Sequence, residues 1–342
     1  MSVIRTGGVS LRLHPRPFLV GALLACAALA MAVLALGTGD YPIAVPDVLR
    51  SLAGAGEPAN DFIVRELRLP RAVTALLVGA ALGLSGAVFQ SLVRNPLASP
   101  DILGFTHGSA TGALLVIVLL GGNSLALACG ALAGGVLTGL AVYVLAWRGG
   151  LHGYRLILTG IGLAAILTGV NGYLLTRGDI IEAGRAVLWI TGSLDGRGWD
   201  DALPLLGALT VLLPVVFLGC ARALRMMEMG EDASYALGVR VEHVRLTLLA
   251  AAVLLAAFAA AAAGPVSFVA LTAPQLARRL TRAPGPNLLP ALCTGAALLV
   301  TADWLAQRAF TGSVLPVGVV TGVLGGCYLV WLLATERRTG RI

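Results

Sequence analysis

Long apolar runs, separated by short polar segments, occupy almost the whole of the 342-residue chain. A helix needs about 20 apolar residues to cross the hydrocarbon core of a bilayer, and most of the runs reach this length. The eighth run is short, which is typical of a broken or partly re-entrant helix. The pattern predicts ten membrane-spanning helices, over 18–37, 71–93, 99–120, 124–147, 155–176, 201–220, 244–263, 266–281, 288–309 and 315–334.

Residues 1–37 fit two interpretations. Three arginines precede the first apolar run and small residues follow it, which resembles a secretory signal peptide. The run is as long as a full span, however, and further spans follow it, so we expect a retained first helix. No long linker divides the chain, and we therefore predict one all-α transmembrane domain, residues 1–342, folded as a compact bundle.

The composition supports a membrane protein and excludes some chemistry. The chain is 58% hydrophobic and 12% charged, whereas a soluble domain is about half apolar and about a quarter charged. All 24 basic residues are arginine. Because a Walker A loop requires lysine, the chain carries no P-loop ATPase of its own, and Schiff-base catalysis through lysine is likewise excluded.

The net charge of +7 does not indicate nucleic-acid binding, because the arginines form short clusters between apolar runs. With the N-terminus in the cytoplasm, 16 of the 24 basic residues fall on the inner side. This bias is the positive-inside pattern, and it predicts that both termini lie in the cytoplasm.

Few side chains in the apolar runs carry chemistry. The five cysteines and four histidines are scattered, so neither a disulfide framework nor a zinc site is indicated. Asp303 is the one acid clearly inside an apolar run, whereas ion-coupled carriers usually keep ionisable groups in the membrane interior. We therefore predict a passive pathway with no catalytic residue, metal or cofactor. An ion-coupled secondary carrier and a membrane-embedded enzyme remain as alternatives.

Three polar segments are candidates for function. The turn at 94–104 contains two prolines, and Ser99 and Asp101 suit the first turn of the helix that follows. The inner segment 226–245 contains a short predicted helix ended by Gly238, which suits contact with a cytoplasmic partner. On the outer side, three arginines precede the second span, against the positive-inside trend: Arg65, Arg68 and Arg71.

Glycines spaced four apart predict close helix packing, since small residues let helix backbones approach one another in a membrane. The pairs are Gly79 and Gly83, Gly130 and Gly134, Gly318 and Gly322, and Gly322 and Gly326.

Several motifs, in order, resemble the FecCD family of ABC importer permeases for ferric siderophores, haem and vitamin B12. They are RLPR at 68–71, GAALGLSGAVFQSLVRNPLASPDILGFTHGSATGA at 79–113, GPVSFVALTAPQLARRLTR at 264–282, LLPALCTGAALLVTADWLAQR at 288–308 and LPVGVVTGVLGGCYLVWLL at 315–333. The resemblance covers the chain from about Leu67 to Leu333. It implies a type II ABC importer permease fold, shared with the vitamin B12 importer permease, in the inner membrane.

The resemblance also implies partners and roles. A pair of permeases, two cytoplasmic ATPase subunits and an extracytoplasmic siderophore-binding protein would assemble in membrane lipid. The roles carried over are coupling to the ATPase by Gly230, Glu231, Asp232, Ala233, Ser234 and Gly238, docking of the binding protein by Arg68, Arg71 and Arg308, and an inner gate at Gly153 and Tyr154.

Within the family, the chain is most similar to the second permease subunit of ferric-enterobactin importers. That similarity implies a heterodimer and a catecholate siderophore, with a homodimer, haem and vitamin B12 as alternatives. The sequence departs from the family pattern at Gln275, where histidine is common, and at Gln307, where arginine is usual and Arg308 follows.

Overall fold

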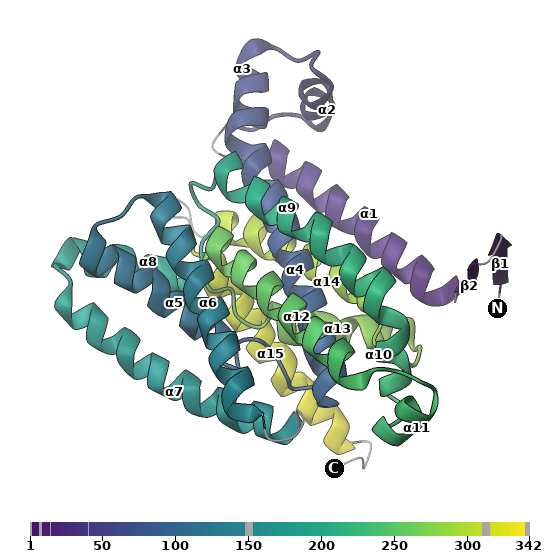
Figure 1. Cartoon of the computed structure of the whole chain (residues 1–342). Coiled ribbons are helices and arrows are strands. Elements are labelled where there is room, and N and C mark those ends of the chain that lie inside the picture. Colours follow the sequence, from purple (N-terminus) through teal and green to yellow (C-terminus); the bar gives the residue numbers. More distant parts are fainter. Residues whose placement is uncertain are drawn as a thin grey trace.

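The computed structural model describes residues 2–6, 9–13, 15–39, 41–147, 153–309 and 315–338, and helices make up most of them. The only strands among these residues are β1 (Ser2–Thr6) and β2 (Val9–Leu13), which pair antiparallel before the first helix. Figure 1 shows long helices packed side by side, with short helices projecting at both ends of the bundle.

Each of the ten predicted spans corresponds to a helix. Among the described residues, seven helices are long and apolar enough to cross a membrane, and two apolar segments, 105–120 and 317–332, are shorter. The helix of the eighth predicted span, residues 269–281, is also short and is less apolar than these. The spans are α1 (Pro15–Gly37), α4 (Leu69–Val93), α5 (Phe105–Leu115) with η2 (Val116–Leu120), α6 (Ser124–Ala146), α7 (Gly153–Arg177), α9 (Trp199–Pro214) with η3 (Val215–Cys220) and α10 (Ala221–Met227), α12 (Val241–Ala263), α13 (Val269–Thr281), α14 (Leu288–Arg308) and α15 (Val317–Arg338).

Five short helical segments lie outside the predicted spans, four of them were not predicted, and two of these run without a break into α4 as one helix over 58–93. They are α2 (Val45–Ala53), α3 (Pro58–Phe62), η1 (Ile63–Arg68), α8 (Ile180–Thr191) and α11 (Glu231–Ala236). Only α11 was expected from the sequence. The helices α2 and α3 project from one end of the bundle, and α11 lies at the other end (Figure 1).

Two helices form the centre of the bundle. In the most apolar windows of the spans that contain α4 and α12, 78% and 67% of residues are buried, against 17% in α7. The α4 helix packs against α14, α12 and α13, and α12 also contacts α6 and α9. Most residues of α7 are therefore exposed in this chain.

Glycines allow the closest approach between central helices. A Cβ added to Gly79 would lie 2.3 Å from the backbone oxygen of Gly295 on α14, and one added to Gly134 would lie 2.2 Å from the Gly108 oxygen on α5. The predicted close packing is thus confirmed for these helices. Gly322 and Gly326 have no atom within 4 Å of such a Cβ, so that pair makes no close contact within the chain.

The structure corrects one predicted boundary and supports another. Residues 99–104 form turns, and α5 begins only at Phe105 with Gly104 as its N-cap, so Ser99 and Asp101 do not start that helix. The eighth span is short, as predicted. Residues 264–268 are not helical, and α13 begins at Val269 after Phe268, whose φ of 68° is left-handed.

Candidate functional site

The outer arginines are held by contacts within the chain. Arg68 donates from Nη1 to the Leu36 oxygen at 2.8 Å and from Nη2 to the Tyr41 oxygen at 2.6 Å. Leu36 lies in the last turn of α1, whose carbonyls lack helical partners and carry partial negative charge. Arg68 therefore caps α1. In the same way, Arg65 donates from Nε to the Ser51 oxygen at 2.7 Å.

Arg71 joins α4 to α14 through an ion pair. Its Nη2 donates to Asp303 Oδ1 at 2.9 Å and its Nε to Asp303 Oδ2 at 3.1 Å, a two-pronged contact of the kind that arginine makes best. Gln307 donates to Asp303 Oδ2 at 2.8 Å. A third contact runs from Arg71 Nη1 to Asp195 at 3.1 Å.

A cavity of about 410 Å³ opens beside this ion pair, and both Arg68 and Arg71 line it, together with Asp195, Asp303 and Gln307. Arg308, the third predicted docking residue, does not line the cavity. It is exposed, and its guanidinium carbon lies 4.9 Å from the ring centroid of Trp304. The structure thus brings two of the three residues together, and their docking role stays a prediction.

At the opposite end, the predicted coupling segment forms the short helix α11. Gly230 and Gly238 flank it with φ of 127° and 78°, a backbone region that other residues adopt with strain. Ser234 is fully buried and donates to the Gly230 oxygen at 2.7 Å. Glu231, Asp232 and Ala233 are exposed. The predicted helix is confirmed, and its coupling role stays a prediction.

The surface of this inner segment is apolar in part. Met229, Tyr235 and Leu237 are more than half exposed, and they lie next to the exposed acids of α11. Large apolar side chains gathered on a short surface helix are typical of a contact site for another protein.

Arg245 fastens α11 to the centre of the bundle, a role that the sequence analysis missed. It lies on α12, is 7% exposed, and donates to Glu231 on α11 and to Glu242 on its own helix. The sequence signal was present, because Arg245 lies inside a predicted span. A buried arginine needs acidic partners, and Glu231 and Asp232 were the nearest candidates outside α12.

A second polar cluster joins the end of α10 to α4 and α13. Burial raises the pKa of Glu228, and a hydrogen bond from Ser91 and the charges of Arg278 and Arg94 act against that shift. Arg94 donates to the Met227 oxygen at 2.6 Å. The segment leading into α11 is therefore anchored to two spanning helices.

The predicted inner gate residues lie at the start of α7. Gly153 packs against Val93, the last residue of α4, with 3.1 Å between a Cβ built on the glycine and the Val93 oxygen. Tyr154 is 77% exposed. The contact of Gly153 places the start of α7 at the C-terminal end of α4, and the gating role of both residues stays a prediction.

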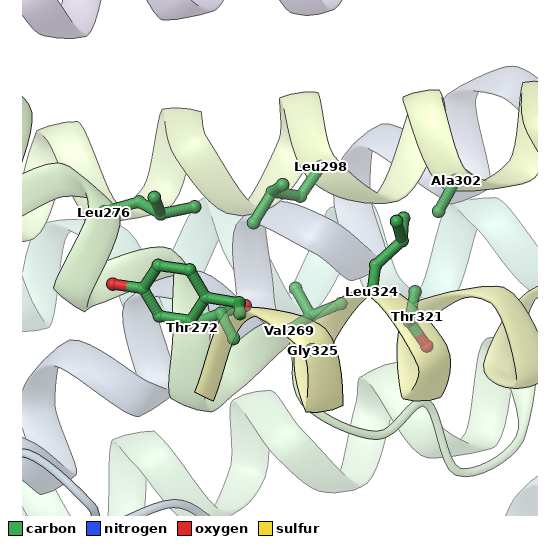
Figure 2. A pocket seen from close by; sticks show the side chains of 9 residues that line it. Val269, Thr272, Leu276, Leu298, Ala302, Thr321, Leu324 and Gly325 are labelled. Carbon is green, nitrogen blue, oxygen red and sulfur yellow. The ribbon is translucent and has the colours of Figure 1, made fainter. Parts of the chain in front are cut away.

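A cavity between α13, α14 and α15 is too small for a chelate. It measures about 70 Å³, against roughly 300–1,000 Å³ for typical ligand pockets. Figure 2 shows Leu298 and Ala302 of α14 facing Leu324 and Thr321 of α15 across it. Its mostly apolar lining and its size are those of a packing defect.

Among the described residues, no group of three or more histidines, cysteines or acids is placed to hold a metal ion. The five cysteines are all free.

Comparison with known proteins decides the family. The model of the FecCD transport family matches residues 18–335. The chain belongs to that family. It is 44% identical to the ferric enterobactin transport system permease protein FepG of Escherichia coli (strain K12), over 92% of this chain and 96% of FepG. It is 38% identical to the achromobactin transport system permease protein CbrC of Dickeya dadantii (strain 3937), over 90% of this chain and 89% of that protein.

A solved structure supports the fold of this FecCD member. The chain superposes with a TM-score of 0.80, at 29% identity, on an inward-facing structure assigned to the metal-chelate type of ABC transporter, covering 93% of this chain and 99% of the other. The predicted all-α type II importer permease fold is thereby confirmed. So is the prediction that the chain is a transport subunit rather than an enzyme.

Proposed function

We propose that this chain is the permease subunit of an ATP-driven ABC importer that moves a ferric catecholate siderophore into the cytoplasm. The observation that carries the proposal is the 44% identity to the ferric enterobactin permease over nearly the full length of both chains. An achromobactin permease and an Fe(3+) dicitrate permease are also relatives, so iron chelates are the shared substrate class. A hemin permease among the relatives keeps haem as the second candidate.

The orientation follows from charge and from the two ends of the bundle. The end of the bundle that carries α11, Arg94 and Arg278 is rich in arginine. By the positive-inside rule, that end lies in the cytoplasm. The end that carries α2, α3 and the Arg71–Asp303 pair then faces the outside (Figure 1). We propose a multi-pass protein of the inner membrane with both termini in the cytoplasm.

The exposed surfaces suggest a contact for each partner. The inner segment with Tyr235, Leu237 and the acids of α11 suits the cytoplasmic ATPase subunit. The cavity beside Arg71 suits the extracytoplasmic binding protein, since charges at such a rim steer and orient docking. No nucleic acid is expected among the partners.

The face formed by α7, α8 and α15 suits a second permease subunit. The α8 helix contacts both of the others. Large apolar side chains are exposed on all three, and Gly162, Gly169 and Gly322 have no neighbour within 4 Å of an added Cβ. Small residues on an exposed helix face permit close helix–helix contact. The pathway would then run between two subunits, and the relationship to FepG favours a heterodimer.

The energy source follows from the same arrangement. ATP-driven closure of the ATPase subunits would move α11, and Arg245 would carry the movement to α12 and thence to α4. Access to the pathway would alternate between the two sides, with the start of α7 as the inner gate. Among the described residues, the spans hold few ionisable groups, which suits a broad and chemically inert route.

Uptake of radiolabelled iron, supplied as ferric catecholate siderophore, tests the function. In a strain that lacks this chain, we expect uptake to be lost and then restored by the wild-type gene. Asp232→Arg together with Ser234→Arg should give a permease that is present in the membrane but transports at background rate. Unchanged uptake on deletion would contradict the substrate, and haem and vitamin B12 would be tested next. Uptake driven by an ion gradient without an ATPase would favour a secondary carrier.

Arg245→Met should uncouple ATP hydrolysis from transport. The variant removes the charge that holds Glu231 of α11 against α12, so we expect uptake to fall about tenfold or more, the effect of misplacing a functional element slightly. The measurements are siderophore uptake and ATPase activity of the purified complex in nanodiscs. Arg240→Met, at an exposed arginine two residues beyond Gly238, is the matched control. Equal uptake by both variants would contradict the role of Arg245.

A further inference from the structure

Arg71 is shared between two carboxylates that differ in burial. The Asp303 side chain is 3% exposed and the Asp195 side chain is 64% exposed, with Arg71 between them at 16%. Asp303 receives Nε and Nη2, and Asp195 receives only Nη1, at 3.1 Å. Water and salt screen the exposed contact far more than the buried one. The contact with Asp195 is therefore the exchangeable one.

The exchangeable contact lies where a carboxylate from another protein can reach it. Arg71, Asp195 and Asp303 all line the cavity of about 410 Å³ at the outer end of the bundle. Asp303 already satisfies two nitrogens of the guanidinium. An incoming acidic side chain would thus compete with Asp195 alone for Nη1.

Asp195 belongs to a segment that ties three helices together. The Gly192 oxygen, just after α8, accepts a hydrogen bond from the Gly318 nitrogen of α15 at 3.0 Å. The Ser193 nitrogen donates to the Ala263 oxygen at the end of α12 at 2.8 Å. These two backbone hydrogen bonds do not depend on the Asp195 side chain. Release of Asp195 would therefore remove one side-chain contact next to α8 and α15, two helices of the proposed subunit face, and leave the segment itself in place.

We propose that Asp195 is an internal placeholder for an acidic side chain of the extracytoplasmic binding protein. On docking, the partner's carboxylate replaces Asp195 on Nη1 of Arg71, while Asp303 keeps Arg71 in place. The exchange frees the Asp195 side chain, which lies next to the segment that joins α8 to α15 at the outer end of the bundle. This inference rests on the proposed function, in which the cavity beside Arg71 receives the binding protein.

Binding to the assembled transporter tests the exchange. The complete importer is placed in nanodiscs, and the siderophore-binding protein of the same organism, loaded with ferric catecholate siderophore, is titrated by biolayer interferometry. We expect Asp195→Asn to lower Kd about two- to fivefold, the worth of an exposed ion pair that no longer competes. Asp200→Asn removes a charge from another exposed acid of the outer surface, and its Kd should equal that of the wild type.

A double variant at the buried ion pair distinguishes failure of this inference from failure of the docking proposal. Arg71→Gln with Asp303→Asn leaves no buried charge unpaired, and it should weaken binding and abolish the effect of Asp195→Asn. The double variant could weaken binding while Asp195→Asn alone leaves Kd unchanged or raises it. That result would contradict the role of Asp195 as a placeholder, and docking at Arg71 would stand. If the pair binds as tightly as the wild type in a folded complex, docking at Arg71 is itself wrong.

Discussion

Gly295→Ala is expected to destabilise the bundle by about 3 kcal/mol, at the upper end of the range for an overpacked core. A Cβ on residue 295 of α14 would lie 2.1 Å from the Gly79 oxygen and 3.0 Å from the Gly83 Cα on α4. These atoms belong to the backbone of the most buried helix, so no side chain can rotate away. The two helices would have to separate along their whole contact.

The measurement is the folded fraction of purified permease in detergent, titrated with sodium dodecyl sulfate and followed by size-exclusion chromatography. Gly207→Ala is the matched control, because no atom lies within 4 Å of an added Cβ on that exposed glycine of α9. The free energy of unfolding of the control should rise by up to about 1 kcal/mol, because alanine has the higher helix propensity. If Gly295→Ala were as stable as Gly207→Ala, the close α4–α14 contact would be wrong.

The spanning helices were predictable because hydropathy alone determines them. A run of about 20 apolar residues has no stable alternative to a helix in lipid, where every backbone polar group must be satisfied internally. The same argument does not apply outside the membrane. Water can satisfy the backbone there, so α2 and α8 leave only weak patterns of turn residues and amphipathic spacing, and the sequence analysis missed both.

The start of α5 shows where local helix-capping rules fail. Ser99 and Asp101 are good helix-capping residues, yet the helix begins at Phe105 after Gly104. The turns at 99–104 pack against α7, since a Cβ on Gly104 would lie 3.2 Å from Ala164. Just before them, Gln275 of α13 donates to the Pro96 oxygen at 2.8 Å. Local turn bonds satisfy this backbone in place of a helix: the Leu103 nitrogen donates to the Ser99 oxygen at 3.2 Å, and the Phe105 nitrogen donates to the Pro100 oxygen at 3.1 Å.

The two candidate sites also differ in how far the sequence could predict them. The coupling segment was visible as the longest inner polar stretch, because its position between spans and its glycines are local features. The ion pair of Arg71 with Asp303 joins residues 232 positions apart, and no spacing rule connects them. Both residues were recognisable in the sequence, Arg71 as an outer arginine and Asp303 as an acid inside an apolar run. Only the fold shows that they are partners.

Arg71→Leu is expected to destabilise the folded permease by roughly 3–5 kcal/mol, since it leaves the carboxylate of Asp303 buried without its partner charge. Gln307 alone would remain as a donor to that carboxylate. Replacing both residues, Arg71→Leu with Asp303→Leu, should restore most of the lost stability, because an apolar pair in place of a buried ion pair is often neutral or better. The double-mutant cycle in detergent measures the coupling directly.

An exposed ion pair on the same outer end provides the control. Arg50 donates to Asp47 at 3.2 Å, but the two side chains are 69% and 44% exposed, so Arg50→Leu should cost no more than about 1 kcal/mol. If Arg71→Leu lost as little stability as Arg50→Leu, water would reach Asp303, and the pair would not be a structural link between α4 and α14. A large loss that the second substitution repairs would instead show that Asp303 holds Arg71 in position, which is the condition for any exchange at its exposed nitrogen.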